Sequence, residues 1–280
     1  MKHIKNALAL LLVLSLSLTL LCACGGTQEP SEPTEKVSVG ILSAIGISEE
    51  KLNQSSKDTK WTFYNTLDSM LMALEAGKID RADNIPDCVG LYVTANNDKV
   101  QMQKPSEQRS AVLKYHMGVM KDRADLQKKL NDAITAMKAD NTLDNLKTDY
   151  IDGYVVKGRT PEVIEIPTIE GAETLNVAVT GDIPPLDFVT ADGKAAGFNV
   201  AILAELSKRL NMNINLITVD SAARAITLTS GKADVLFWVA TLEFVDTSLN
   251  NEPICNADVP DSVALTEPYY TSDSGQLVLK

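Results

Sequence analysis

The sequence predicts an α/β protein built from two lobes, and three observations support this fold class. The 280 residues exceed one typical domain and suffice for two lobes of roughly 110 residues each. Residues 175–240 carry strand and helix patterns in the order strand, helix, strand, helix, strand. The segment 74–80 matches 228–234 at four of seven positions, and both lie where a helix pattern gives way to a strand pattern.

The N-terminal residues predict an export signal. Lys2 and Lys5 precede a continuous apolar stretch, 7–21, which has the length of a signal-peptide core and is short for a membrane span. Its end resembles the lipobox of bacterial lipoproteins, which implies cleavage before Cys24 and diacylation of that residue. An ordinary signal peptide is the alternative. Residues 1–24 are therefore expected to be removed, and 25–36, which are poor in apolar residues, to form a flexible tether.

Composition excludes some classes of partner. Removal of Lys2 and Lys5 with the signal lowers the net charge from −11 to −13, so nucleic acid is not expected to bind. Cys88 and Cys255 remain after processing, in a compartment that permits disulfides. A bond between them and a pair of free buried thiols are both open.

The earlier half begins with two predicted strands, 36–42 and 61–64. Asn65 or Thr66 is expected to cap a helix with apolar residues at helical spacing, and Gly77 to end it. A further strand covers 114–120. Asp122 is expected to cap the next helix, whose apolar stripe consists of Leu126, Leu130, Ala133, Ile134 and Met137.

The later half begins with a predicted strand at 175–179. Pro184 and Pro185 exclude helix and central strand, so a loop follows. A tight turn at 192–194 precedes an amphipathic helix over 200–210 and a strand over 214–219. Ser221 is expected to cap a short helix that ends before Gly231, and 235–240 form a buried strand.

Four motifs of the later half resemble one known family. They are Thr-Gly-Asp-Ile-Pro-Pro at 180–185, Gly-Lys-Ala-Ala-Gly-Phe-Asn-Val at 193–200, Ser-Gly-Lys-Ala-Asp at 230–234 and Thr-Glu-Pro-Tyr-Tyr at 266–270. Together and in this order they are similar to the first lobe of the extracellular solute-binding proteins, family 3. These are two-lobed, type II periplasmic-binding-protein-like receptors of ABC importers, mostly for amino acids. The resemblance implies that each lobe is a mixed sheet flanked by helices.

The order of the two parts departs from the family. Residues 118–143 are similar to the end of these receptors, so 37–152 resemble the second lobe with its closing helices, 153–172 form a linker, and 173–280 resemble the first lobe. A circular permutation explains this order, and two incomplete copies are the alternative. Permutation predicts that helices within 123–150 pack on the later half, and that 277–280 form the strand that crosses to the second lobe.

The resemblance also implies where a ligand binds, namely between the lobes, at the ends of strands and at helix N-termini. The ligand-binding residues that the resemblance implies are Ser43, Tyr64, Asn65, Asp182, Phe188, Arg224, Trp238 and Thr241. Each has a plainer interpretation: the aromatic residues as core, the small polar residues as turn or cap residues, and Arg224 as a solvated charge.

Two departures affect the ligand. The arginine that clamps an amino-acid carboxylate in this family is replaced by Asp246, and the acid that meets the ligand amine has no counterpart in register, since only Asp83 and Asp87 lie near its place. An ordinary α-amino acid is therefore not a safe prediction. We expect no enzyme, because His116 lies in a strand and no zinc-ligand spacing, nucleophile motif or phosphate loop is present.

Together, the motifs and the predicted export signal indicate a lipid-anchored substrate-binding protein on the extracytoplasmic side of the cell membrane. It would capture a small polar solute, amino-acid-like or related, for an ABC permease, and would need no cofactor or metal. The alternative is an adaptor or sensor lipoprotein that retains the fold without transporting.

Overall fold

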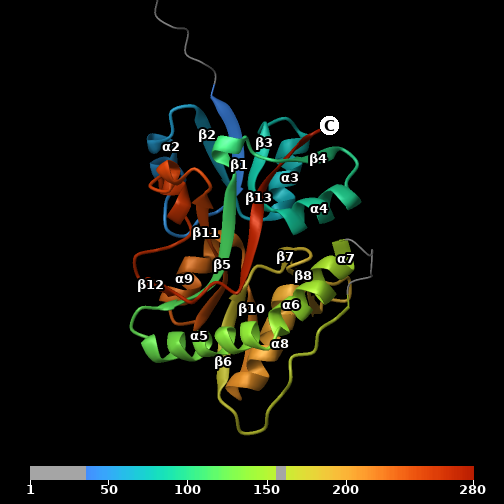
Figure 1. The fold of residues 1–280 in the computed structure, drawn as a ribbon, viewed down its shortest axis with the longest axis vertical. Helices are drawn as coiled ribbons and strands as arrows, with labels where there is room; N and C mark the ends of the chain where they lie inside the picture. The colour runs from blue at the N-terminus through green and yellow to red at the C-terminus, as the bar shows by residue number, and fades with distance from the viewer. Residues whose placement is uncertain (1–35, 156–161) are drawn as a thin grey trace, which may run out of the picture. The chain divides into compact units, whose positions relative to one another are not determined.

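The computed structural model describes residues 36–155 and 162–280 (Figure 1). The predicted signal peptide, Cys24 and all of the tether except its last residue lie outside the described residues. Residues Lys36–Lys280 form one compact unit. Within the described ranges, no helix combines the length and the apolar character needed to cross a membrane.

A ten-stranded mixed sheet forms the centre of this unit, with the strand order β10-β6-β11-β5-β13-β3-β1-β2, and with β12 and β4 paired beside that path. Its strands are β1 (Val37–Leu42), β2 (Thr59–Tyr64), β3 (Arg81–Pro86), β4 (Val100–Gln103), β5 (Ala111–Met120), β6 (Thr174–Val179), β10 (Asn213–Thr218), β11 (Val235–Phe244), β12 (Val263–Leu265) and β13 (Tyr270–Leu279). A separate small sheet joins β7 (Asp182–Ile183), β8 (Asp187–Val189) and β9 (Ala195–Ala196). The expected α/β fold class is confirmed.

Helices flank the sheet. They are α2 (Glu49–Ser55), α3 (Leu67–Glu75), α4 (Asp87–Asn96), α5 (Ala124–Ala139), α6 (Thr142–Lys147), α7 (Gly153–Val155), α8 (Phe198–Leu210) and α9 (Arg224–Thr229), with a π-helical turn η2 (Thr148–Asp152) and 3-10 turns η1 (Glu107–Arg109), η3 (Ser221–Ala223), η4 (Thr247–Leu249) and η5 (Pro253–Asn256). The amphipathic patterns explain the longest ones: the five apolar residues of the stripe predicted for α5 are all buried.

Two groups of parallel strands define two lobes. In lobe A, residues 36–110, β1 pairs in parallel with β2 and β3. In lobe B, residues 111–155 and 162–273, β6 pairs in parallel with β10 and β11. The antiparallel strands β5 and β13 run side by side between them (Figure 1).

The last strand crosses between the lobes. Its first residues, from Tyr270 to Asp273, pair with β5, and its later residues, from Ser274 to Leu277, pair with β3. Residues from Gln276 to Leu279 also pair with β4. The prediction that the chain end forms a crossing strand is therefore confirmed.

The helices that follow β5 return to lobe B. Both α5 and α6 contact α8. Arg209 of α8 lies 2.8 Å from the Asp140 carboxylate at the end of α5, and Asn131 Oδ1 accepts a hydrogen bond of 2.7 Å from the Glu267 N–H. The last short turn, α7, contacts a helix of lobe A, α4. The predicted packing of these helices on the later half is confirmed, and it is the packing that circular permutation requires.

Two predicted caps are wrong. The first residue of α5 is Ala124, and no side chain caps this helix, so Asp122 has no such role. Ser221 is the first residue of the turn η3 that leads into α9, and Asp220 caps this turn, because its carboxylate accepts from the Ala223 N–H. Of the two residues proposed to cap α3, Thr66 does so, in a reciprocal capping box with Ser69.

Candidate ligand-binding site

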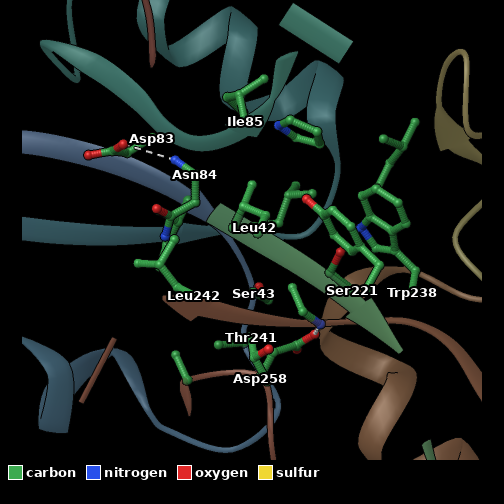
Figure 2. Close-up of a pocket in the computed structure, with 18 of the residues that line it drawn as sticks. Leu42, Ser43, Asp83, Asn84, Ile85, Ser221, Trp238, Thr241, Leu242 and Asp258 are labelled. Carbon is green, nitrogen blue, oxygen red and sulfur yellow. Dashed lines mark hydrogen bonds between the residues drawn. The ribbon is translucent and has the colours of Figure 1, made fainter. Parts of the chain in front are cut away.

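A pocket lies between lobe A and lobe B (Figure 2). It has a volume of about 100 Å³. Its lining is mostly apolar and comes from both lobes and from β5: Ile41, Leu42, Ser43, Ala44, Leu67, Asp83, Asn84, Ile85, Pro86, Val89, Leu113, Tyr115, Ile183, Ser221, Arg224, Trp238, Ala240, Thr241, Leu242, Ile254, Ala257 and Asp258. Binding sites of this kind combine apolar walls with a few placed polar groups.

The lobe A wall is built where neighbouring parallel strands end. Ser43 follows β1, and β3 supplies Asp83 and Asn84 from its middle and Ile85 and Pro86 from its end. Asn84 has a left-handed backbone, with φ of 58°, beside a register shift in the pairing of β3 with β13. A bulge of this kind redirects a side chain that a regular strand would aim elsewhere.

The lobe B wall contains a second irregular strand position. Trp238 has φ of 66°, and the pairing of β11 with β5 shifts register between Leu236 and Val239. Its ring stacks on Tyr115, with centroids 3.7 Å apart and planes 15° apart. Trp238 is thus both buried and part of the pocket wall, so the two interpretations of this residue are not exclusive.

Arg224 is the buried cation of the pocket wall, with 4% of the residue exposed. Its Nη1 lies 3.1 and 3.2 Å from the two carboxylate oxygens of Asp258. Its Nη2 donates to the carbonyl oxygen of Trp238. The Asp258 carboxylate also accepts from the Ala240 N–H at 2.9 Å. Burial raises the pKa of Asp258 and Arg224 opposes that rise.

Thr241 lines the pocket and contacts the buried His116. The imidazole Nδ1 lies 2.7 Å from the carbonyl oxygen of Thr266, and Nε2 lies 3.1 Å from Thr241 Oγ1. Because a carbonyl can only accept, Nδ1 carries the proton in the neutral ring. Burial lowers the pKa of His116. Both ring nitrogens are therefore used inside the wall, in agreement with a structural histidine.

Ser43 lies in the wall, whereas Tyr64 and Asn65 do not line the pocket. Ser43 Oγ lies 3.2 Å from the Tyr64 carbonyl oxygen and 3.0 Å from Asn65 Oδ1. The Asn65 carbonyl accepts from the Ser221 N–H at 3.1 Å, which joins lobe A to lobe B. Tyr64 and Asn65 therefore lie behind Ser43 and do not form part of the pocket wall.

Asp182 also joins the lobes. Its Oδ2 accepts a hydrogen bond of 3.1 Å from the N–H of Leu67, the first residue of α3. Burial raises the pKa of Asp182 to about 6; the Leu67 N–H opposes this rise, and Asp187 and Asp68 add to it. A helix N-terminus attracts anions, and here the chain's own carboxylate occupies that position.

The remaining predicted positions lie away from the pocket. Phe188 packs edge-on against Tyr154, with ring centroids 6.5 Å apart. Asp246, in the place of the family's arginine, accepts from the Ser248 N–H at the start of η4. Asp87 begins α4 and does not line the pocket, whereas Asp83 does.

Four of the eight predicted positions, namely Ser43, Arg224, Trp238 and Thr241, are thus brought together in the pocket wall. The sequence interpretation missed Asn84, Tyr115 and Asp258. Only Asp258 leaves a usable signal, a carboxylate in the loop between two predicted strands.

Among residues 36–155 and 162–280, no group of three or more His, Cys, Asp or Glu residues could hold a metal ion. Cys88 and Cys255 are both buried and free.

Residues 175–242 match the family model of the bacterial extracellular solute-binding proteins, family 3. The resemblance seen in the motifs is confirmed over this segment, which supplies the lobe B wall from Ile183 to Leu242. The match covers this segment of the chain alone. No curated protein matches the chain.

The solved structures that match the chain have low sequence identity to it. One is the binding protein AgaA of A. tumefaciens R10 in complex with agropinic acid, with 11% identity and a TM-score of 0.38, covering 79% of this chain and 55% of that one. Another is the probable amino-acid ABC transporter binding protein YtmK of Bacillus subtilis, with 12% identity and a TM-score of 0.36, covering 88% and 85%. A third is the GluR0 ligand-binding core of Nostoc punctiforme in complex with L-glutamate, with 12% identity and a TM-score of 0.34, covering 88% and 85%. The chain thus spans 55% of the length of the first of these.

Proposed function

We propose that this protein is a lipid-anchored, extracytoplasmic solute-binding protein that captures a small solute between lobes A and B and presents the closed form to an ABC permease. The observation that carries the proposal is the pocket between the lobes, one wall of which is built by the family 3 segment. The lipid anchor rests on Cys24 and the apolar stretch before it.

Contacts between the lobes supply the mechanism. Several hydrogen bonds cross between them, including those from Leu67 N–H to Asp182, from Ser221 N–H to the Asn65 carbonyl, and from Gly46 N–H to the Ala257 carbonyl at 2.8 Å. A solute that contacts both walls adds to these bonds only when the lobes are closed, so it favours the closed state. The permease then recognises that state.

The size of the pocket implies that the lobes separate during capture. Cavities that bind drug-sized ligands measure roughly 300–1,000 Å³, whereas this one measures about 100 Å³. We infer that this conformation is the closed state. Solute enters when the bonds between the lobes break, and closure around it restores them.

Thermal unfolding tests the proposal. We expect one class among amino acids, small peptides, polyamines, organic acids and neutral solutes to raise the melting temperature, because a ligand that binds only the folded state stabilises it by mass action. Substitution of Ala44→Phe, in the pocket wall, should abolish the shift. Substitution of Val245→Phe, where the native side chain is exposed, should leave it intact.

A second function is favoured by one specific observation. Arg224 is bound by Asp258, and Asp246 replaces the family's clamp, so the usual amino-acid contact is absent from the described pocket. An adaptor or sensor that keeps the fold without a solute would show this. A cooperative melt that no compound shifts would favour this function over transport.

A further inference from the structure

We propose that Asp258 acts as a built-in counter-ion that occupies Arg224, and that the pocket consequently selects uncharged, largely apolar solutes and excludes carboxylates. This inference names the ligand class of the site and rests on the proposed solute-binding function. It departs from the polar, amino-acid-like solute that the sequence motifs predict.

The first argument is that Arg224, the one cationic side chain among the described residues of the pocket lining, is already paired. Arg224 is 4% exposed, and both of its terminal nitrogens are used, Nη1 by Asp258 and Nη2 by the Trp238 carbonyl. The Asp258 carboxylate is held in turn by the Ala240 N–H. A ligand carboxylate would have to displace a carboxylate that is already placed, buried and hydrogen-bonded, and would leave the displaced one without a partner.

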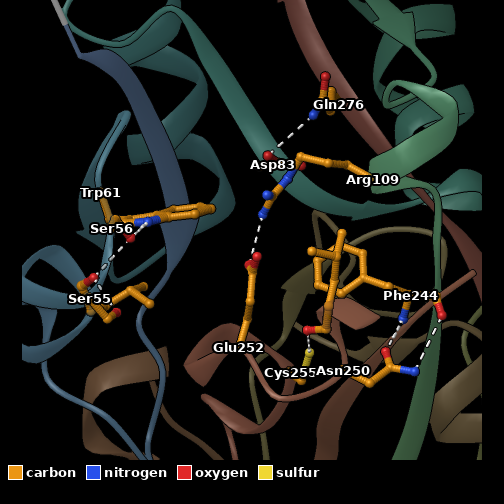
Figure 3. A network of polar contacts seen from close by, with 12 residues as sticks. Ser55, Ser56, Trp61, Asp83, Arg109, Phe244, Asn250, Glu252, Cys255 and Gln276 are labelled. Carbon is orange, nitrogen blue, oxygen red and sulfur yellow. Dashed lines mark hydrogen bonds and ion pairs between the residues drawn. The ribbon is translucent and has the colours of Figure 1, made fainter. Parts of the chain in front are cut away.

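The second argument is that Asp83, the acidic residue that lines the pocket besides Asp258, is also paired with protein groups. Asp83 Oδ2 lies 3.2 Å from Arg81 Nε and 3.2 Å from Gln276 Nε2, and Figure 3 shows the contact with Gln276. Its other oxygen accepts from the Asn84 N–H at 2.9 Å. A cationic ligand would have to compete with Arg81. The charged side chains of the described pocket are thus paired with protein groups, and neither sign of ligand charge has a vacant partner.

The third argument is what remains for a ligand. Most of the lining is aliphatic or aromatic, and burying a charge against it without a partner is costly. The Asn84 amide and the Ser221 hydroxyl line the pocket and form no side-chain hydrogen bond within the described part of the chain. They can orient an uncharged group such as an amide, a lactam or a hydroxyl. The pocket therefore suits a neutral solute with one or two hydrogen-bonding groups.

The first experiment compares ligands of one shape and different charge on the unmodified protein. Acetamide with acetate, and benzamide with benzoate, are such pairs, and binding is followed by thermal shift. We expect any skeleton that binds to bind as the amide at least tenfold more tightly than as the carboxylate. Carboxylates that bind as tightly as amides would overturn the charge selection while leaving the receptor function in place.

The second experiment removes the counter-ion. In Asp258→Gly, Arg224 loses its carboxylate and gains a space beside it, so acetate should raise the melting temperature. We expect a rise of about 3 °C at an acetate concentration tenfold above its dissociation constant. Neither acetamide at equal concentration nor sodium chloride at equal ionic strength should reproduce this rise. The unmodified protein and the matched control Asp246→Gly, where the native residue is exposed, should not respond to acetate.

Each outcome is decisive. No response of Asp258→Gly to acetate would overturn the assignment of Asp258. If the variant does not melt cooperatively by itself, refolding in acetate but not in acetamide would support it, and refolding in neither would count against it. If acetate stabilises the variant but no solute binds the unmodified protein, the counter-ion assignment holds and the solute-binding function fails.

Discussion

Asp182 places a carboxylate in a position that costs free energy at neutral pH. It is half-buried at the N-terminus of α3, and burial raises its pKa from 3.8 to about 6. Since the folded protein holds the proton more tightly than the unfolded chain, this residue makes stability fall as pH rises from about 4 to about 6, and its effect is constant above that range. The cost comes from burying the ionised carboxylate, since the hydrogen bond from the Leu67 N–H itself favours the charged form.

We expect Asp182→Asn to be more stable than the unmodified protein at pH 7.5 and equal to it at pH 4. A shift of this size corresponds to at most about 3 kcal/mol, and the partial exposure of the carboxyl reduces it to ~1–2 kcal/mol. The asparagine oxygen can still accept from the Leu67 N–H. Urea denaturation at a series of pH values measures the difference.

The matched control for this experiment is Asp261→Asn, since the native residue is exposed. Its stability should follow that of the unmodified protein at every pH. A stability difference for Asp182→Asn that does not change between pH 4 and 7.5 would show that the carboxyl does not titrate differently in the folded state.

Residue-scale features of the site were the hardest to predict. Arg224 and Asp258 are 34 positions apart, and only the tertiary fold joins them. Phe188 was expected near the ligand, yet it packs on Tyr154 because the closing segment after β5 returns to cover it. A motif shows which residues end a strand, but not which neighbour covers them.

At the scale of elements, prediction succeeded where a segment carries its own period. The strands at β1, β2, β6 and β10 and the helices α5 and α8 follow apolar patterns that fix one buried face. Strand β3, Arg81–Pro86, was missed because it holds charged and polar residues and is a strand through its pairing with β1 and β13. Tertiary pairing overrides local propensity there.

The caps of α3 provide a test at this scale. Thr66 Oγ1 accepts from the Ser69 N–H at 3.1 Å, whereas Asn65 is exposed and does not cap the helix. We expect Thr66→Ala to lower the free energy of unfolding by about 1 kcal/mol, and Asn65→Ala to lower it by less than about 0.5 kcal/mol. Urea midpoints at constant slope give both values. Equal losses would mean that the contact of Ser43 with the Asn65 side chain contributes as much to stability as the cap does.

At the scale of the whole described unit, the order of the lobes is the feature that the motifs anticipated and the packing supports. Lobe A precedes lobe B in the chain, yet the helices after β5 pack on lobe B and the last strand completes the sheet of lobe A. Two incomplete copies would not need these exchanges. We therefore favour a permuted receptor.

The geometry allows the family order to be restored. Strand β1 is parallel to β3 and β13 is antiparallel to it, so the start of β1 and the end of β13 lie at the same edge of the sheet, separated only by β3 (Figure 1). Two strand spacings amount to about 10 Å, which a linker of about six residues spans. The chain can then be opened between Val155 and Glu162, so that it begins with the first-lobe-like part.

We expect this rearranged protein to unfold cooperatively, with a free energy of unfolding within about 2 kcal/mol of the original, because loop-closure entropy changes slowly with loop length. A second rearrangement, opened between Trp238 and Val239 inside β11, should not fold, since it cuts a strand that pairs with both β5 and β6. Circular dichroism and urea denaturation compare the two. If the first rearrangement also failed to fold, the connection between residues 155 and 162 would be a necessary part of the structure rather than a linker, and the permuted origin would lose its support.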